Sequence, residues 1–389
     1  MIKTIKVMLN PNNKQATKLK ESAGVARFAY NFALNREKEN HENGGKFLTE
    51  RELRKELTVL KEKEEYKWLN DYSNNIPKQA IKDACNAYVR FFKKQTGFPR
   101  YKGKRKSKPS FYVDTDKIQF TDTHIKLEKL TTSRKANKQK LNHIRLSEKS
   151  RIPIGNKYIN PRVTFDGLNW YISVGIEVEN NEEVPKNDGL GVDLGLKNLA
   201  ICSDNPNPIK NINKPKEIRK LKKKKCRLQR QVSRKYLKNK KGGSYCKTSN
   251  IIKIDKKILK LNHRLTNIRH NYLHEVTTEI INRKPKFIVL EDLNVKGMMK
   301  NKNLAEKIQE QCFYEFYRQI KYKAKWNNIE FIEAPRFYPS SKKCSNCGSI
   351  KKDLKLSDRV YVCEYCHSVI DRDYQAAINL YNYGKSIAF

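Results

Sequence analysis

The chain opens with alternating apolar and polar residues and then changes to a helical pattern. Residues 2–8 alternate and predict a strand. From about residue 11 to 105, apolar side chains recur three or four residues apart, most clearly in 27–34 and 76–92, with Lys and Arg on the other faces. A segment rich in Gly, Pro and Lys, 96–106, ends this block. We therefore predict one strand followed by a helical region.

A β-rich stretch follows, up to about residue 180. Its clearest unit is a pair of β-type runs, 162–165 and 170–178, on either side of Asp166-Gly167, a dipeptide that strongly favours a hairpin turn. We expect the first strand to join this β-block, which makes the helical region an insertion within it. The acidic segment 179–188 then predicts a linker.

A third region alternates strands with helices. The segments 190–193 and 199–202 predict a hairpin, and 287–290 predicts a buried strand. A helix over 304–325 and a strand over 329–333 follow. This order of elements is typical of a mixed α/β sheet.

Two long helical segments lie between that hairpin and the buried strand. In the first, 15 of the 28 residues from 214 to 241 are Lys or Arg, which is too dense for a fold to leave without solvent or phosphate. A solvated helix face is the simpler interpretation, and we favour a phosphate track. The second segment carries nine apolar residues spaced by three or four, which we interpret as core and not as a cofactor site: Ile251, Ile254, Ile258, Leu261, Leu265, Ile268, Tyr272, Val276 and Ile280.

The composition points to a nucleic-acid partner. The chain has 389 residues, with 83 Lys and Arg against 41 Asp and Glu, and a formal net charge of +42. Such an excess repels itself unless a polyanion neutralises it, and nucleic acid is the most abundant polyanion inside cells. Basic proteins of membrane surfaces concentrate charge in one tail or helix, whereas Lys and Arg run from end to end here.

The same composition excludes two other classes. A hydrophobic content of 38% is enough for packed cores, so full disorder is excluded, and the length allows several domains. No stretch approaches the ~18–20 consecutive apolar residues that a membrane helix needs. We therefore expect a cytoplasmic protein with no membrane partner.

The nine cysteines fall into two groups, five that are scattered along the chain and four that are closely spaced. Four of them form a C-x2-C, fifteen-residue, C-x2-C pattern that is typical of a zinc ribbon, because each pair supplies two thiolates to a tetrahedral ion. Redox use of a C-x-x-C pair is the alternative. Four thiolates leave no open position, so the pattern predicts one structural Zn(II) ion with His367 as a bystander. The predicted ligands are Cys344, Cys347, Cys363 and Cys366.

Acidic residues stand where two strands end and where a helix begins. Asp193 and Glu291 each end a hydrophobic strand, and Asp371 and Asp373 open a helix after the last cysteine. Any one of them alone would be interpreted as a cap or a surface residue. Together, on a strongly basic chain, they indicate a site for divalent cations. Two Mg²⁺ ions held by carboxylate oxygens can activate a water and stabilise the leaving oxygen of a phosphodiester.

Several segments, in this order, resemble one known family. They are 191–200, 288–298, 322–326, the two C-x2-C pairs and 371–379. In them the chain resembles the TnpB family, proteins encoded by insertion sequences and related to type V CRISPR effectors. The resemblance covers essentially the whole chain and is weaker in its N-terminal half. It implies a RuvC-like nuclease of RNase H fold that a transposon-derived noncoding RNA guides to DNA.

The resemblance also implies roles for the acids. Asp193, Glu291 and Asp373 correspond to the family's catalytic triad and would hold two Mg(II) ions. Asp371 is more consistent with a helix cap and stays open as an alternative third ligand. The family's last motif usually has Asn where this chain has Gln375, so a longer amide lies near the site.

The implied fold is a multidomain α+β chain. Its predicted parts are a WED-like β-barrel (1–10 and 106–184), an inserted REC-like helical domain (11–105), a RuvC-like mixed α/β nuclease domain of RNase H fold (185–342 and 368–389) and a zinc ribbon (343–367).

The implied partners are a noncoding guide RNA, one for each protein monomer, and target double-stranded DNA with a short flanking motif. Lys78 and Gln79, on the helix after Ile76, are candidates for contacting that motif. The predicted function is an RNA-guided DNA endonuclease that cuts both strands with one site. The alternatives are a nuclease-inactive, RNA-guided DNA-binding repressor and a guide-independent transposase accessory or RNA-binding protein.

Overall fold

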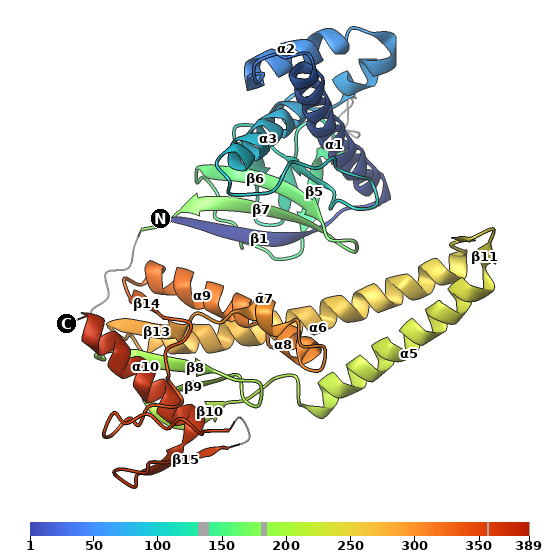
Figure 1. Cartoon of the computed structure of the whole chain (residues 1–389). Coiled ribbons are helices and arrows are strands. Elements are labelled where there is room, and N and C mark those ends of the chain that lie inside the picture. Colours follow the sequence, from blue (N-terminus) through green and yellow to red (C-terminus); the bar gives the residue numbers. More distant parts are fainter. Residues whose placement is uncertain (131–139, 180–184, 356–357, 389) are drawn as a thin grey trace. The chain divides into compact units, whose positions relative to one another are not determined.

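A computed structural model of the chain describes residues 1–130, 140–179, 185–355 and 358–388. The chain divides into two compact units, Met1–Val178 and Glu179–Phe389, each with its own hydrophobic core (Figure 1). The division falls at the predicted acidic linker, part of which lies outside the described residues. None of the helices in the described ranges has a stretch apolar and long enough to span a membrane.

The first unit is built on an antiparallel sheet of seven strands in the order β2-β6-β7-β1-β5-β4-β3. The first strand joins the β-block as predicted, since it pairs with β7 from Ile2 opposite Glu177 to Leu9 opposite Trp170. The strands are β1 (Ile2–Asn10), β2 (Ser110–Tyr112), β3 (Gln119–Phe120), β4 (His124–Lys126), β5 (His143–Leu146), β6 (Tyr158–Phe165) and β7 (Trp170–Glu177).

The predicted hairpin at Asp166-Gly167 is confirmed. Gly167 has a φ of +100°, a conformation that glycine adopts without steric cost. The Asp166 carboxylate accepts hydrogen bonds from the backbone N–H groups of Leu168 and Asn169, both at 2.8 Å, which fixes the turn between β6 and β7.

For the predicted WED-like β-barrel, the described residues show a sheet whose edge strands do not close on each other. Its two edges are β2, with three residues, and β3, with two, and these are not paired with each other. Strands this short offer too few backbone groups to complete a closing ladder.

The helices of this unit are inserted between β1 and β2, as predicted. Capping boxes start two of them: Asn12 exchanges hydrogen bonds with Gln15, and Thr49 does so with Glu52. Buried residues from these helices and from the sheet form a single core. The helices are α1 (Asn13–Glu42), α2 (Glu50–Leu60), the 3₁₀ segment η1 (Glu64–Asp71) and α3 (Asn75–Phe92), with a short 3₁₀ turn, η2 (Lys140–Asn142), before β5.

The second unit contains the predicted mixed sheet, in the order β10-β9-β8-β13-β14. β8 pairs antiparallel with β9, whereas β13 runs parallel to both β8 and β14. The edge strand β10 was not predicted, because its two prolines indicate a loop, and an edge position tolerates them. The strands are β8 (Leu190–Leu194), β9 (Ala200–Cys202), β10 (Asn205–Ile209), β13 (Phe287–Glu291) and β14 (Glu330–Ala334).

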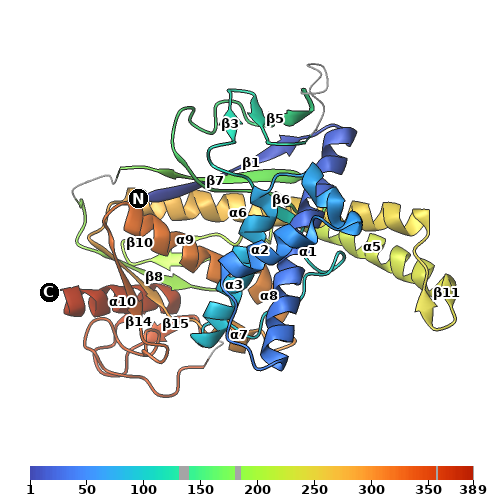
Figure 2. The ribbon, with the colours of Figure 1, turned by 90° about the horizontal axis from the view of Figure 1, so that it is seen from above.

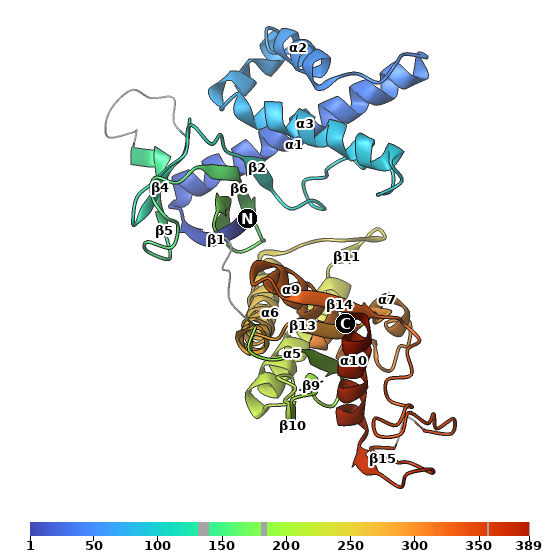
Figure 3. The same ribbon diagram turned by 90° about the vertical axis from the view of Figure 1, so that its left-hand side faces the viewer.

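Helices cover both faces of this sheet. Residues of α6 (Ser249–Asn282) and α9 (Phe313–Trp326) share one core with β8 and β13, and α10 (Arg372–Ala388) packs on β8 and β13 from the other side (Figures 1 and 3). The single helix predicted over 304–325 was wrong. It is split into α8 (Ala305–Gln311) and α9 by Cys312, which has a left-handed φ of +55°, after a short α7 (Val295–Met298).

α5 (Lys216–Lys238) and α6 form a long antiparallel arm that ends in the hairpin β11 (Lys240–Lys241) and β12 (Ser244–Tyr245) (Figures 1 and 2). The apolar stripe predicted as core is buried at both ends of α6 and at Leu265, and its other members in between are partly buried. At the tip it packs with α5 through Val232 and Ile251, and at the base it joins the core of the sheet.

Candidate metal centres

Two of the predicted acids lie side by side on neighbouring parallel strands. Leu290 of β13 is paired with Val192 of β8, so Glu291 and Asp193 are each the next residue at the same end of the sheet. Neighbouring strands are about 4.8 Å apart, and residues in register point to the same face. Val192 and Leu290 belong to the core with α6 and α9, so the two acids face the opposite side, where α10 lies.

α10 brings the third acid to the same edge. A Cβ added to Gly191 would lie 2.1 Å from the carbonyl oxygen of Ala377 and 2.4 Å from the backbone nitrogen of Tyr381, so helix and strand touch backbone to backbone. Asp373 lies one turn before Ala377, in the first turn of α10. The glycine therefore permits an approach that carries Asp373 to the end of the sheet where Asp193 and Glu291 stand.

The three carboxylates act on one another electrostatically. Burial raises the pKa of Asp193 well above its usual range, and the charges of Glu291 and Asp373 raise it further, while Arg372 partly offsets them. Burial also raises the pKa of Glu291, against a hydrogen bond from the hydroxyl of Ser340. Such a cluster of partly buried acids costs free energy unless protons or cations neutralise it.

Asp371 makes different contacts. Its carboxylate accepts hydrogen bonds from the backbone N–H groups of Asp373, at 2.9 Å, and Tyr374, at 3.0 Å, in the manner of a helix N-cap. It is exposed, whereas Asp373 is half-buried with its carboxylate 3.8 Å from the guanidinium of Arg359.

A second layer of polar residues supports the acids. Ser340, which the sequence did not single out, donates its hydroxyl to Glu291, and its carbonyl accepts from the amide of Asn379 at 2.7 Å. Gln375, one turn before Asn379, is fully buried, and neither its amide nitrogen nor its amide oxygen has a hydrogen-bond partner among the described residues.

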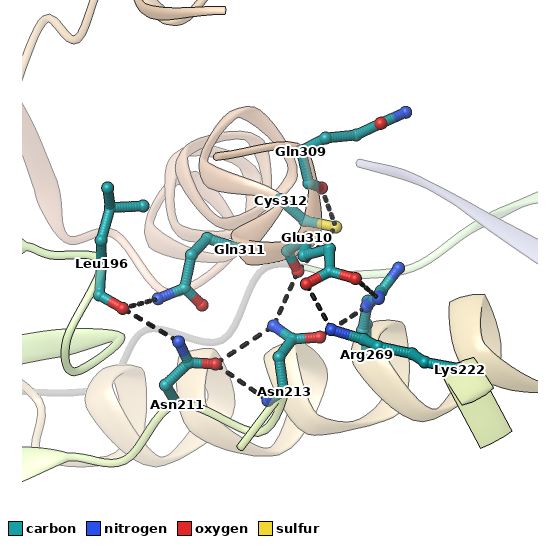
Figure 4. A network of polar contacts seen from close by, with 9 residues as sticks. All are labelled: Leu196, Asn211, Asn213, Lys222, Arg269, Gln309, Glu310, Gln311 and Cys312. Carbon is teal, nitrogen blue, oxygen red and sulfur yellow. Dashed lines mark hydrogen bonds and ion pairs between the residues drawn. The ribbon is translucent and has the colours of Figure 1, made fainter. Parts of the chain in front are cut away.

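Residues at the end of α8 hold the turn that follows Asp193 (Figure 4). The amide nitrogen of Gln311 donates to the carbonyls of Gly195, at 2.9 Å, and Leu196, at 3.2 Å. The neighbouring Glu310 forms ion pairs with Lys222 of α5 and Arg269 of α6. The base of the arm and the turn beyond Asp193 are thus tied to the same end of α8.

This donor set fits Mg²⁺. Carboxylate oxygens are the protein ligands that this hard ion prefers. Asp193, Glu291 and Asp373 do not bring three oxygens within 4.8 Å of one another. The fit to Mg²⁺ therefore rests on the type of the donor atoms.

The four predicted zinc ligands do come together. Their sulfur atoms all lie within 4.8 Å of one another, the only such group of three or more potential ligands in the part of the chain that the structure describes. Cys344 lies 3.6 Å from Cys366, and Cys347 lies 3.5 Å from Cys363, sulfur to sulfur. Backbone N–H donation from Cys366 and the Ser349 hydroxyl lower the pKa of Cys363, which favours the thiolate that a zinc ion binds.

Short strands support this cluster. β15 (Val360–Val362) pairs antiparallel with β16 (Val369–Asp371), and Tyr361 is fully buried against Cys344 and Cys363. β16 leads directly into α10, so the cysteine cluster and Asp373 are joined by a few residues of continuous secondary structure.

The basic segment is exposed to solvent. Most Lys and Arg side chains of α5 are exposed, and Lys222 is the only one of them in an ion pair between described residues. In the first unit, Lys78 of α3 is exposed, while the amide of Gln79 donates to Asp83 at 3.0 Å.

Three family patterns match the chain. The family described as "Probable transposase" matches residues 172–302, the "Cas12f1-like, TNB domain" matches 313–380, and a "Helix-turn-helix domain" matches 1–46. In the structure the last of these covers β1 and α1. The TNB match contains the four cysteines and most of α10.

Known proteins match over nearly the whole chain. "Putative RNA-guided DNA endonuclease InsQ" of Escherichia coli is 30% identical over 99% of this chain and 93% of its own, and a "Putative RNA-guided DNA endonuclease" of Streptomyces pristinaespiralis is 28% identical over 97% and 88%. The Cas12f1 protein of a solved complex with sgRNA and target DNA shares the fold, with a TM-score of 0.52, 14% identity and 98% coverage of both chains. Shorter matches are named TnpB-like proteins. The chain belongs to the TnpB family.

Proposed function

We propose that the chain is an RNA-guided DNA endonuclease of the TnpB type. It would use a transposon-derived noncoding guide RNA and a short flanking DNA motif, and cut both strands with one Mg²⁺-dependent site. The observation that carries the proposal is that Asp193 and Glu291 end neighbouring parallel strands while Asp373 lies in the first turn of the helix packed on them, on a chain with a net charge of +42. The relatives named RNA-guided DNA endonucleases support it.

The domain assignment follows the same resemblance. We assign a WED-like function to the antiparallel sheet (1–10 and 106–184) and a REC-like function to the helical insertion (11–105). A RuvC-like nuclease of RNase H fold would comprise 185–342 and 368–389, with a zinc ribbon over 343–367. The parallel pair β8 and β13 with α10 across it supports the nuclease assignment.

In this proposal Asp193, Glu291 and Asp373 hold two Mg(II) ions. Bound there, the ions would activate a water and stabilise the leaving oxygen of the phosphodiester. The protein's own residues set the geometry of the site. Ser340 orients Glu291, and the cap from Asp371 fixes the first turn of α10. The contact at Gly191 sets how closely that helix approaches the sheet. The capping contacts of Asp371 favour Asp373 as the third ligand.

The charge distribution supports the partners. The exposed cations of α5 would track phosphates of the guide RNA or its hybrid with DNA, and counterion release makes such binding strongly salt-dependent. The Zn(II) ion on the four cysteines would be structural, since four thiolates leave no open position. We expect one monomer to bind one guide RNA and to act in the prokaryotic cytoplasm.

The retained acids favour a nuclease over a nuclease-inactive repressor. We expect such a repressor to have lost at least one of the three acids, and this chain keeps Asp193, Glu291 and Asp373. A guide-independent transposase accessory or RNA-binding protein would not copurify with an RNA of uniform end sequence.

The test is guided cutting of DNA by the purified chain with its copurifying RNA. After that RNA is sequenced, a change in its 3′ guide segment should redirect Mg²⁺-dependent cutting to a matching target. Glu291→Gln should abolish cutting and leave target binding intact, because the amide removes a metal ligand and does not change the basic surfaces. Unchanged cutting by this variant would refute the acid site, and cutting that ignores the guide would refute guidance.

A further inference from the structure

A small aromatic pocket opens beside Glu291. It has a volume of about 240 Å³ and lies at the ends of β13 and β14, next to the first turns of α9. Leu194, Phe313, Tyr314 and Tyr317 form its apolar walls, and Glu291 and Glu333 lie at its edge. Glu291 is one of its lining residues, so the pocket borders the candidate nuclease site at the end of β13.

The left-handed residue Cys312 produces this arrangement. The chain changes direction there between α8 and α9, so Phe313 and Tyr314 begin α9 next to the end of β13. Phe313 is buried and anchors the turn.

The two tyrosines differ in how firmly they are held. Tyr317 packs edge-on against Phe331 with ring centroids 5.3 Å apart, and its hydroxyl donates to Glu333 at 3.0 Å, so it is a fixed wall. Tyr314 is 68% exposed and makes no aromatic contact or hydrogen bond among the described residues. This exposed ring, whose charged neighbour is Arg318, lines the pocket beside its apolar walls and can stack on a planar ligand.

The charges around the pocket decide what that ligand is. Glu291, Asp292 and Glu333 line it; Asp292 is paired with Arg336, and the other two carboxylates disfavour a phosphate. A nucleobase is planar, uncharged and covalently attached to the phosphodiester that the acid site would hold. Aromatic side chains stack on any base, without sequence preference.

We propose that this pocket binds the nucleobase next to the scissile phosphate, with Tyr314 stacked on its face. This inference rests on the proposed nuclease function and deepens it. Tyr314 is a positioning residue: it holds the base so that the attached phosphate lies against Asp193 and Glu291. A base paired within a duplex cannot enter the pocket, so the strand at the site must be unpaired.

The test combines Tyr314→Ala with single abasic nucleotides in the target strand, in single-turnover guided cutting. For the unsubstituted chain, an abasic nucleotide at one position next to the cut should slow cutting roughly 5- to 100-fold. Tyr314→Ala should slow cutting of the intact strand by a similar factor and show no further loss at that position, since both changes remove one interaction. Tyr314→Phe should behave like the unsubstituted chain.

Controls separate this result from a loss of folding or of the nuclease itself. Phe337→Ala removes a 93% exposed aromatic residue outside the pocket. This variant should cut the intact strand at the original rate and should be slowed by the abasic nucleotide as much as the unsubstituted chain is. In an Asp193→Asn background, 2-aminopurine at the same position should be quenched on binding, and Tyr314→Ala should abolish that quenching.

Two outcomes would overturn the inference. Additive losses from Tyr314→Ala and the abasic nucleotide, or cutting by the unsubstituted chain that ignores every abasic position, would exclude the pocket and leave the nuclease function standing. No guided cutting at all by the unsubstituted chain would instead refute the proposed function, and this inference with it.

Discussion

The close approach of α10 to β8 gives the sharpest prediction. In Gly191→Ala, the new Cβ would stand 2.1 Å from the carbonyl oxygen of Ala377, where at least 3.0 Å is needed. This oxygen and the nearby backbone nitrogen of Tyr381 both belong to the backbone of α10, so the helix must move away by about 1 Å. Such overpacking typically costs about 1–3 kcal/mol of unfolding free energy. Since Asp373 lies one turn away, its carboxylate moves with the helix.

The expected functional effect is larger than the loss of stability suggests. A displacement of about 1 Å in a catalytic group lowers rates on the order of 100-fold. Single-turnover guided cutting measures this effect, and urea unfolding of the same protein measures stability. Binding of guide RNA should be unchanged, because the substitution is buried beneath α10.

A second glycine of the same interface is the matched control. Gly384 of α10 also lacks room for a Cβ, which would meet Val289 at 2.4 Å and Phe287 at 2.5 Å. It lies eleven residues after Asp373, roughly 16 Å along the helix. Gly384→Ala should therefore cost similar stability and much less cutting. A Gly191→Ala protein that cuts at the original rate would refute the proposed packing of α10 at the site.

Two further predictions concern the zinc cluster and an ion pair. Cys363→Ser should lose the bound zinc and expose the segment around it to protease, because the four thiolates hold that segment in place; a variant that keeps one zinc per chain by metal analysis would contradict this assignment. In the first unit, Asp83 accepts two hydrogen bonds from Arg162, at 2.7 and 2.9 Å; burial alone would raise the pKa of Asp83, but these bonds and one from Gln79 hold it below its usual range. A carboxylate whose pKa is lower in the folded state stabilises the fold at pH values above its unfolded-state pKa, and this stabilisation is lost as the pH falls through its folded-state pKa. Asp83→Asn should therefore lower the free energy of unfolding by about 1–3 kcal/mol at pH 7 and by progressively less below pH 4. A loss of unfolding free energy that does not change with pH, measured by urea unfolding, would contradict the pairing.

Local patterns predicted most of the elements. The Asp166-Gly167 turn, the strands around Val192 and Val289 and the apolar stripe of α6 all follow from side-chain periodicity or turn chemistry, which act within a few residues. The break at Cys312 was missed because no Gly or Pro marks it and the sequence on both sides is helical. The residue that follows the break, Phe313, is buried in the structure, which the local sequence pattern does not reveal.

The sequence singles out the residues of the candidate site and does not give their arrangement. Acids at strand ends drew attention to Asp193 and Glu291, but only the observed strand order places β13 directly beside β8. The contact from Ser340 to Glu291 joins residues 49 positions apart and has no local signal. The role of Gly191 emerges only when the helix that it accommodates is in place.

The central claim is that three acids hold two divalent ions against DNA delivered by RNA. Crystals of the chain with guide RNA and target, grown with Mn²⁺ in place of Mg²⁺, allow the ions to be located by anomalous scattering. The account predicts two peaks about 3.5–4 Å apart, ligated by Asp193, Glu291 and Asp373. No peak within reach of these carboxylates, or ligation by Asp371 in place of Asp373, would contradict it.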